Sequence, residues 1–119
     1  MLGALSACHL EHTRTCPAIS TVTRVVIIGE GGSTLRTFTD ARQISPLVAY
    51  ANARRESSKP WYDMPASNIG AVFYDNSIYL CSIGAGSNFL VIACPNWSGI
   101  RSASGSELSE FKNLIGESR

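Results

Sequence analysis

The sequence predicts an α+β fold: one domain in which a mostly antiparallel five-stranded sheet is covered on one face by two helices, in the order ββ-α-βββ-α. Three observations predict it. Short apolar runs rich in β-branched residues alternate with turn residues. Two stretches carry apolar residues at helical spacing. The length of 119 residues is typical of a single domain with its own core.

The first two strands are expected on either side of a glycine-rich loop. Val22–Ile28 is a continuous apolar run, which favours a strand buried on both faces. Gly29–Gly32 turns the chain, and the alternating pattern of Ser33–Thr39 completes a hairpin.

The first helix is expected between Asp40 and Arg55. Asp40 and Gln43 have the spacing of a capping box, but Pro46 belongs in a first helical turn. The helix therefore either begins at Asp40 and bends, or begins late with Ser45 as its cap. Its apolar face consists of Ile44, Leu47, Val48 and Ala51.

The second half predicts a three-stranded meander and a closing helix. The strands are Ile69–Tyr74, Ser77–Ile83 and Phe89–Cys94, with turns at Asp75-Asn76 and Gly84–Ser87. Ser104 and Glu107 form a second capping box, and Gly116 ends the helix that follows. The apolar stripe of this helix is Leu108, Phe111, Leu114 and Ile115.

Composition excludes two classes of partner. The net charge is +1 and 16% of residues are charged, so no basic stripe for nucleic acid exists. No run approaches the roughly 20 apolar residues of a membrane span, so a membrane is reached only through a lipid anchor. Oligomeric state is not predicted.

Leu5-Ser6-Ala7-Cys8 has the form of a bacterial lipobox, in which Cys8 would be lipidated. Only seven residues precede Cys8, fewer than a basic and apolar signal peptide needs. Two explanations are open: a truncated signal peptide, or an accidental match in a cytoplasmic protein. On the first, residues 1–20 are leader and tether, residues 21–119 are the domain, and the protein is periplasmic.

Three further cysteines remain after Cys8. In an oxidising compartment Cys16 would pair with Cys94 or with Cys81. A turn at Gly84–Ser87 would place Cys81 opposite Leu90, so pairing of Cys81 with Cys94 is disfavoured. The alternative is three reduced, buried thiols.

No catalytic, metal or cofactor site is predicted. The only histidines, His9 and His12, lie in the leader, and Gly84–Ser87 is a turn rather than a nucleophile elbow. Cys8, His9, His12 and Cys16 lack the spacing of structural zinc sites. Asp75 is explained by its turn, and an enzyme using Asp63 and Tyr62 is the weaker hypothesis.

Both tryptophans lie in predicted loops, one covering residues 56–68 and the other residues 95–97. Large aromatic side chains carry much of the binding energy at protein interfaces. The competing interpretation is that they fold back over the open end of the sheet. The predicted binding residues are Trp61, Tyr62, Asp63, Met64, Asn96 and Trp97.

The lipobox, Pro60-Trp61, Phe73-Tyr74-Asp75 and the tail from Glu107 to Gly116 give a resemblance to small bacterial lipoproteins of uncharacterised function. In size and layout the chain is similar to periplasmic immunity lipoproteins. The resemblance implies a non-enzymatic, lipid-anchored protein that inhibits a secreted toxin or a cell-wall enzyme. The alternative is a cytoplasmic protein-interaction or structural module.

Overall fold

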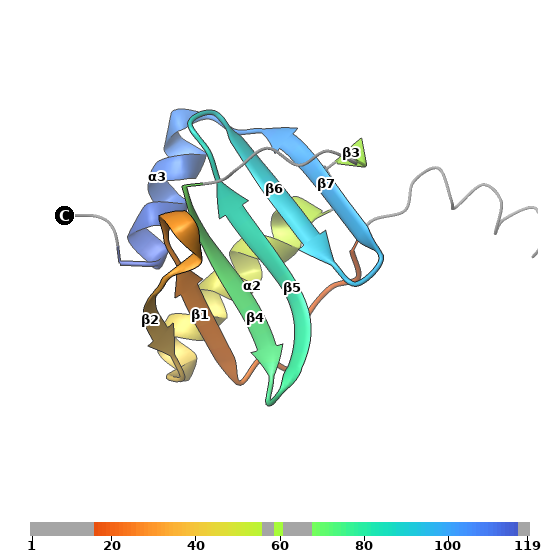
Figure 1. Ribbon diagram of the computed structural model, residues 1–119, viewed down its shortest axis with the longest axis vertical. Coiled ribbons are helices and arrows are strands. Elements are labelled where there is room, and N and C mark those ends of the chain that lie inside the picture. Colours follow the sequence, from red (N-terminus) through yellow and green to blue (C-terminus); the bar gives the residue numbers. More distant parts are fainter. Residues whose placement is uncertain (1–15, 56–58, 61–67, 117–119) are drawn as a thin grey trace, which may run out of the picture.

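A computed structural model of the protein describes residues 16–55, 59–60 and 68–116. All paired strands are antiparallel and form one sheet in the order β2-β1-β4-β5-β6-β7-β3 (Figure 1). The α+β class and the single compact domain are thus confirmed. The elements are β1 (Arg24–Ile28), a 3-10 turn (Glu30–Gly32), β2 (Thr34–Phe38), α2 (Ala41–Arg55), β3 (Lys59–Pro60), β4 (Ile69–Asp75), β5 (Ile78–Ala85), β6 (Phe89–Cys94), β7 (Trp97–Ser102) and α3 (Gly105–Leu114).

The predicted number of five strands is wrong, because β7 and the two-residue β3 lie in segments where the sequence predicts no strand. Pro95 and Asn96 form a two-residue turn after which Trp97 pairs with Cys94. Asn96 has a φ of 71°, and proline followed by a residue of positive φ is the pattern of a type II turn. β3 then pairs with β7 at the edge of the sheet, where proline is tolerated.

Buried and half-buried residues alternate along the strands, so that only one face of the sheet is fully buried. In β1, Val25 and Ile27 are fully buried, whereas Arg24, Val26 and Ile28 are half-buried. The expectation that this strand is buried on both faces is therefore wrong. Both helices lie on the side of Val25 and Ile27, behind the sheet in Figure 1, so a second apolar stripe is left on the other face.

The first helix follows the earlier of the two predicted starts. α2 begins at Ala41 and contains Pro46. The predicted capping box is not formed, because the Asp40 carboxylate accepts from the backbone N–H of Arg42, at 2.9 Å, rather than from Gln43. The buried side chains of α2 are Ile44, Leu47, Tyr50 and Ala51.

The second helix forms as predicted. The Ser104 hydroxyl accepts from the Glu107 N–H, and the Glu107 carboxylate accepts from the Ser104 N–H. Gly116, with a φ of 87°, follows the last turn. The helices are joined because the Tyr50 hydroxyl donates to the Glu107 carbonyl at 2.7 Å and the Tyr50 ring stacks on Phe111.

The turn between β5 and β6 lies two residues later than predicted. β5 continues through Gly84 and Ala85, and the chain turns at Gly86–Asn88. Ala85 therefore pairs with Leu90, and the register places Ser82 opposite Ala93. The expectation that Cys81 lies opposite Leu90 is wrong for the same reason.

Candidate binding face

The face of the sheet opposite α2 and α3 carries mainly small and apolar side chains. We call this surface the open face and define it by Arg24, Val26, Ile28, Gly70, Val72, Tyr74, Tyr79, Ser82, Gly84, Phe89, Val91, Ala93, Ser98 and Ile100. Most of its members are half-buried, in alternation with the buried side chains that face the helices. Within the described residues neither helix covers it.

A row of paired residues that crosses four strands determines the shape of the open face. Ile28 pairs with Gly70, Gly70 with Gly84, and Gly84 with Val91. Two adjacent glycines leave the backbone bare between bulky side chains on either side. A Cβ built on Gly70 would meet only backbone atoms of β5, the closest being the Ile83 carbonyl oxygen at 3.2 Å.

The result is a hollow of about 190 Å³ above the glycine pair. We call it the glycine hollow and define it by Ile28, Gly70, Val72, Ser82, Gly84 and Val91. Sites for drug-sized ligands are usually larger, roughly 300 to 1,000 Å³. The glycine hollow is therefore suited to one inserted side chain rather than to a large cofactor.

Aromatic and polar groups occupy the other end of the open face. The Arg24 guanidinium lies 4.1 Å from the centre of the Tyr74 ring, and that ring meets Tyr79 edge to face. The Tyr79 hydroxyl donates to the Ala93 carbonyl at 3.1 Å and lies 3.4 Å from the Ser82 hydroxyl. Burial raises the pKa of Tyr79, so its hydroxyl keeps its proton at neutral pH.

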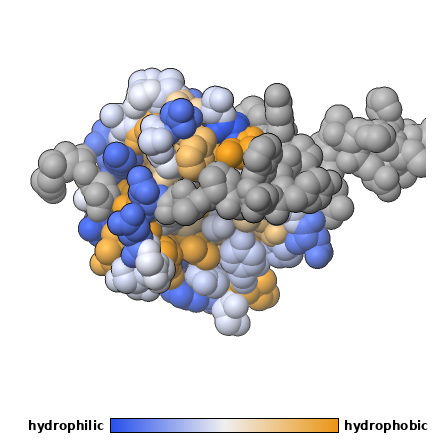
Figure 2. All heavy atoms as spheres, turned by 45° about the horizontal axis from the view of Figure 1, so that its top comes forward, coloured by the Kyte–Doolittle hydropathy of each residue, from blue (hydrophilic) through white to orange (hydrophobic). Residues whose placement is uncertain are grey.

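Among the residues that define the open face, charge is sparse. Figure 2 looks obliquely at the sheet from its upper end and shows hydrophobic residues reaching the surface between hydrophilic ones. On the open face, Arg24 is the only residue of formal charge among the defined members. Its cation is directed over Tyr74, and none of the described residues that line the glycine hollow carries a formal charge.

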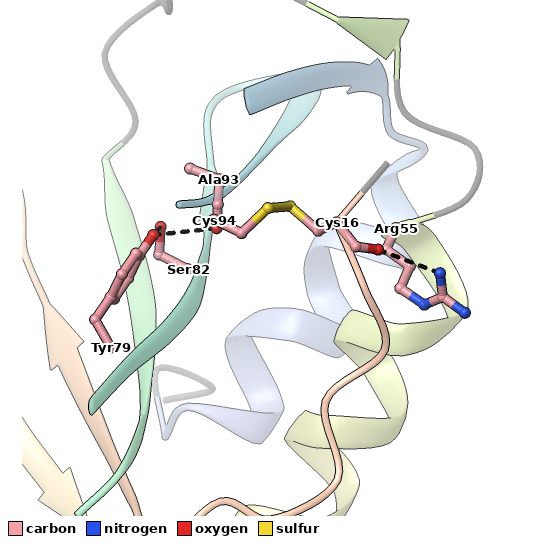
Figure 3. The surroundings of a disulfide bond; sticks show 6 residues. All are labelled: Cys16, Arg55, Tyr79, Ser82, Ala93 and Cys94. Carbon is pink, nitrogen blue, oxygen red and sulfur yellow. Dashed lines mark hydrogen bonds between the residues drawn. A yellow bond between two sulfur atoms is a disulfide. The ribbon is translucent and has the colours of Figure 1, made fainter. Parts of the chain in front are cut away.

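A disulfide joins Cys16 to Cys94 on the opposite side of the sheet (Figure 3). This is one of the two pairings that the sequence left open. The segment that begins at Cys16 is also attached to α2, because Arg55 donates to the Cys16 carbonyl at 3.2 Å. Asn52 exchanges two hydrogen bonds with the backbone of Ile19, of 2.9 and 2.8 Å.

The predicted binding residues fall in three places. Trp61–Met64 and the lipobox residue Cys8 lie outside the described residues. Asn96 is exposed in the β6–β7 turn. Trp97 shares a face with its partner Cys94 and packs half-buried against the core, so it lies on the helix side of the sheet and not on the open face.

The sequence predicts that one face of the sheet is left uncovered, but it does not identify the residues of that face. Its signal is present in β1 and β4, where Val26 and Val72 are apolar although Val25 and Phe73 already supply the core. In a single sheet whose two helices share one side, a strand that is apolar at every position must present half of its side chains to the other side. That inference requires the position of both helices.

Metal ligands and membrane spans were also sought in residues 16–55, 59–60 and 68–116. No group of three or more histidine, cysteine or acidic residues gathers there, and Cys16 is occupied by its disulfide. In the same part of the chain, no helix has the length and hydropathy needed to cross a bilayer.

Comparison of the chain with protein-family models, with curated proteins and with solved structures finds no match.

Proposed function

We propose that this protein is a non-enzymatic, exported binding protein that holds a protein partner against the open face of its sheet. Its most concrete form is a lipid-anchored inhibitor or immunity protein that acts on a periplasmic toxin or a cell-wall enzyme. The observation that carries the proposal is the open face, which combines an uncharged apolar region, the glycine hollow, and a neighbouring Arg24-Tyr74-Tyr79 group.

Such a surface supports protein binding for two physical reasons. Tyrosine and arginine are enriched among the residues that dominate the binding energy of interfaces, since each combines a large contact area with a polar group. The glycine hollow would receive one apolar side chain of the partner, and burying that side chain would contribute roughly 1.5 to 3 kcal/mol.

The Cys16–Cys94 disulfide supports the exported form, because disulfides persist in oxidising compartments. Cys16, the first cysteine of this disulfide, lies eight positions after Cys8 of the lipobox. Lipidation at Cys8 would therefore anchor the protein to the membrane close to Cys16. The segment that begins at Cys16 is held to the domain by the disulfide and by hydrogen bonds from Asn52 and Arg55.

The test is binding to secreted toxins and cell-wall hydrolases encoded beside the gene, measured by calorimetry with Val91→Lys and Ile78→Lys variants. Val91 lines the glycine hollow, whereas Ile78 is 63% exposed at the far end of β5. Val91→Lys is expected to weaken binding at least tenfold and Ile78→Lys to leave it unchanged. Thermal unfolding of both variants checks that they fold.

Failure of every such candidate to bind would remove the immunity form. Equal affinity of the folded Val91→Lys variant for a partner that does bind would remove the open face as the site. Lipidation is tested separately, by metabolic labelling of the full reading frame with an acyl analogue and a Cys8→Ser control.

A further inference from the structure

The register of the sheet brings the free thiol of Cys81 beside the disulfide. Ser82 pairs with Ala93, Ile83 with Ile92 and Ala85 with Leu90. These pairs end at Ser82 and Ala93, and the same register continued by one residue would set Cys81 opposite Cys94. Both side chains belong to the buried, helix-facing side of their strands, with exposed fractions of 6% and 8%.

This placement meets the geometric requirement of a disulfide. Directly opposed residues in an antiparallel pair have Cα atoms about 4.5 to 5.5 Å apart, and disulfides form across Cα separations of about 4.4 to 6.8 Å. The existing bond from Cys16 to Cys94 spans 5.9 Å. The register therefore gives Cys94 a second candidate partner: Cys81 on the neighbouring strand, besides Cys16 of the N-terminal segment.

We propose that Cys81 is an alternative disulfide partner of Cys94, and that thiol–disulfide exchange within the core transfers the bond from Cys16 to Cys81. In the exchange Cys81 loses its proton and its sulfur attacks Cys94 Sγ. The Cys81–Cys94 bond forms as the Cys16–Cys94 bond breaks, and the electron pair and a proton pass to Cys16 Sγ. Among Cys16, Cys81 and Cys94, one disulfide and one thiol are present before and after, so no oxidant or reductant is consumed.

The exchange changes how the N-terminal segment is attached. Before it, the segment is held covalently to β6 and by hydrogen bonds to Asn52 and Arg55 of α2. After it, only the hydrogen bonds to α2 remain and Cys16 carries a thiol. The segment becomes releasable from the domain, and Cys16 becomes available for a bond with another molecule. This step does not depend on the binding function proposed above.

The first experiment removes the present partner. A Cys8→Ser/Cys16→Ser variant, whose two remaining cysteines are Cys81 and Cys94, is oxidised with glutathione disulfide, and its thiols are counted and its disulfides mapped by mass spectrometry. The free thiols of Cys81 and Cys94 are expected to fall from two to none, with one intramolecular bond between them. In the Cys8→Ser/Cys16→Ser/Cys81→Ser control, Cys94 is the one remaining cysteine and is expected to form only a mixed disulfide with glutathione.

The second experiment uses the unaltered protein, so that it does not rely on folding of a variant. The oxidised chain is incubated at pH 9 with N-ethylmaleimide, digested and mapped. Label on Cys16 together with a Cys81–Cys94 linkage supports the exchange. Among Cys16, Cys81 and Cys94, label confined to Cys81 with the Cys16–Cys94 bond intact would overturn it, as would glutathione adducts on both Cys81 and Cys94 of the Cys8→Ser/Cys16→Ser variant.

Discussion

Cys81 is a single thiol enclosed by apolar side chains on the helix-facing side of β5. Burial raises the pKa of the Cys81 thiol to about 11, from an ordinary value of 9.0. The thiolate is the reactive form in disulfide exchange, so at neutral pH nearly all of Cys81 is inert. At neutral pH the Cys16–Cys94 bond is therefore protected from attack by the Cys81 thiolate.

The raised pKa of Cys81 predicts a loss of stability at alkaline pH. Below pH 9 the Cys81 thiol is protonated in both the folded and the unfolded chain, and its burial contributes in full to the unfolding free energy. Between pH 9 and 11 only the unfolded chain loses the proton, which favours unfolding. Two pKa units correspond to about 2 to 3 kcal/mol.

Denaturant unfolding of the unaltered chain and of Cys81→Ala measures this effect, with samples brought to each pH immediately before use. The difference in unfolding free energy between the two proteins is expected to shrink by about 2 kcal/mol from pH 8 to pH 11. The buried tyrosines titrate in both proteins and cancel in the comparison. A difference that is constant with pH would contradict the assignment.

At the scale of elements, the sequence signals that act locally predicted the structure best. The Ser104–Glu107 box starts α3 and Gly116 follows it, because both depend only on residues within one helical turn. The strands Phe89–Cys94 and Ile69–Asp75 also lie where the apolar pattern puts them. For α2, helical spacing prevailed over the proline signal at Pro46.

The elements that could not be predicted depend on partners far away in the sequence. Lys59–Pro60 becomes a strand only because β7 offers an unpaired edge beside it. The sequence predicts both helices on one face of the sheet, but which side chains of each strand turn away from them depends on the packing of distant elements and not on a local pattern. For the candidate site, sequence reasoning supplied the disulfide candidates but placed Trp97 in a loop rather than in a strand of the core.

The β6–β7 turn gives a prediction at this scale. Asn96 has a φ of 71°, which asparagine and glycine adopt at little cost and β-branched residues avoid. Asn96→Val is expected to destabilise the fold by about 1 to 2 kcal/mol, whereas Asn96→Gly should cost less than about 0.5 kcal/mol. Chemical denaturation of both variants measures the difference.

Pro95→Ala, which changes the preceding residue of the same turn, serves as a further control. It should cost no more than about 1 kcal/mol, because the effect of proline here is mainly on the unfolded chain. Equal stability of Asn96→Val and Asn96→Gly would show that the turn does not require a left-handed residue.

At the scale of the whole molecule, the disulfide closes a loop that contains most of the domain. Cys16 precedes the first strand and Cys94 ends β6, with a sequence separation of 78 residues. The bond lies on the helix side of the sheet (Figure 3), so the open face is free of covalent constraint. The N-terminal segment and the proposed binding surface are therefore on opposite sides of one sheet.

Closing so long a loop restricts the unfolded chain more than the folded one. A loop of this length is worth about 4.5 kcal/mol in the chain-entropy account, and typical native disulfides contribute about 2 to 4 kcal/mol. We therefore expect a Cys16→Ser/Cys94→Ser variant to lose about 2 to 4 kcal/mol of unfolding free energy, measured by urea titration. Cys81→Ser, which leaves the bond in place, should lose less than half as much.

In the double variant the open face should keep its partner affinity wherever the domain remains folded, since no residue of the disulfide belongs to that face. A double variant with the urea midpoint of the oxidised protein would mean that the core alone, and not the bond, holds the N-terminal segment to the domain.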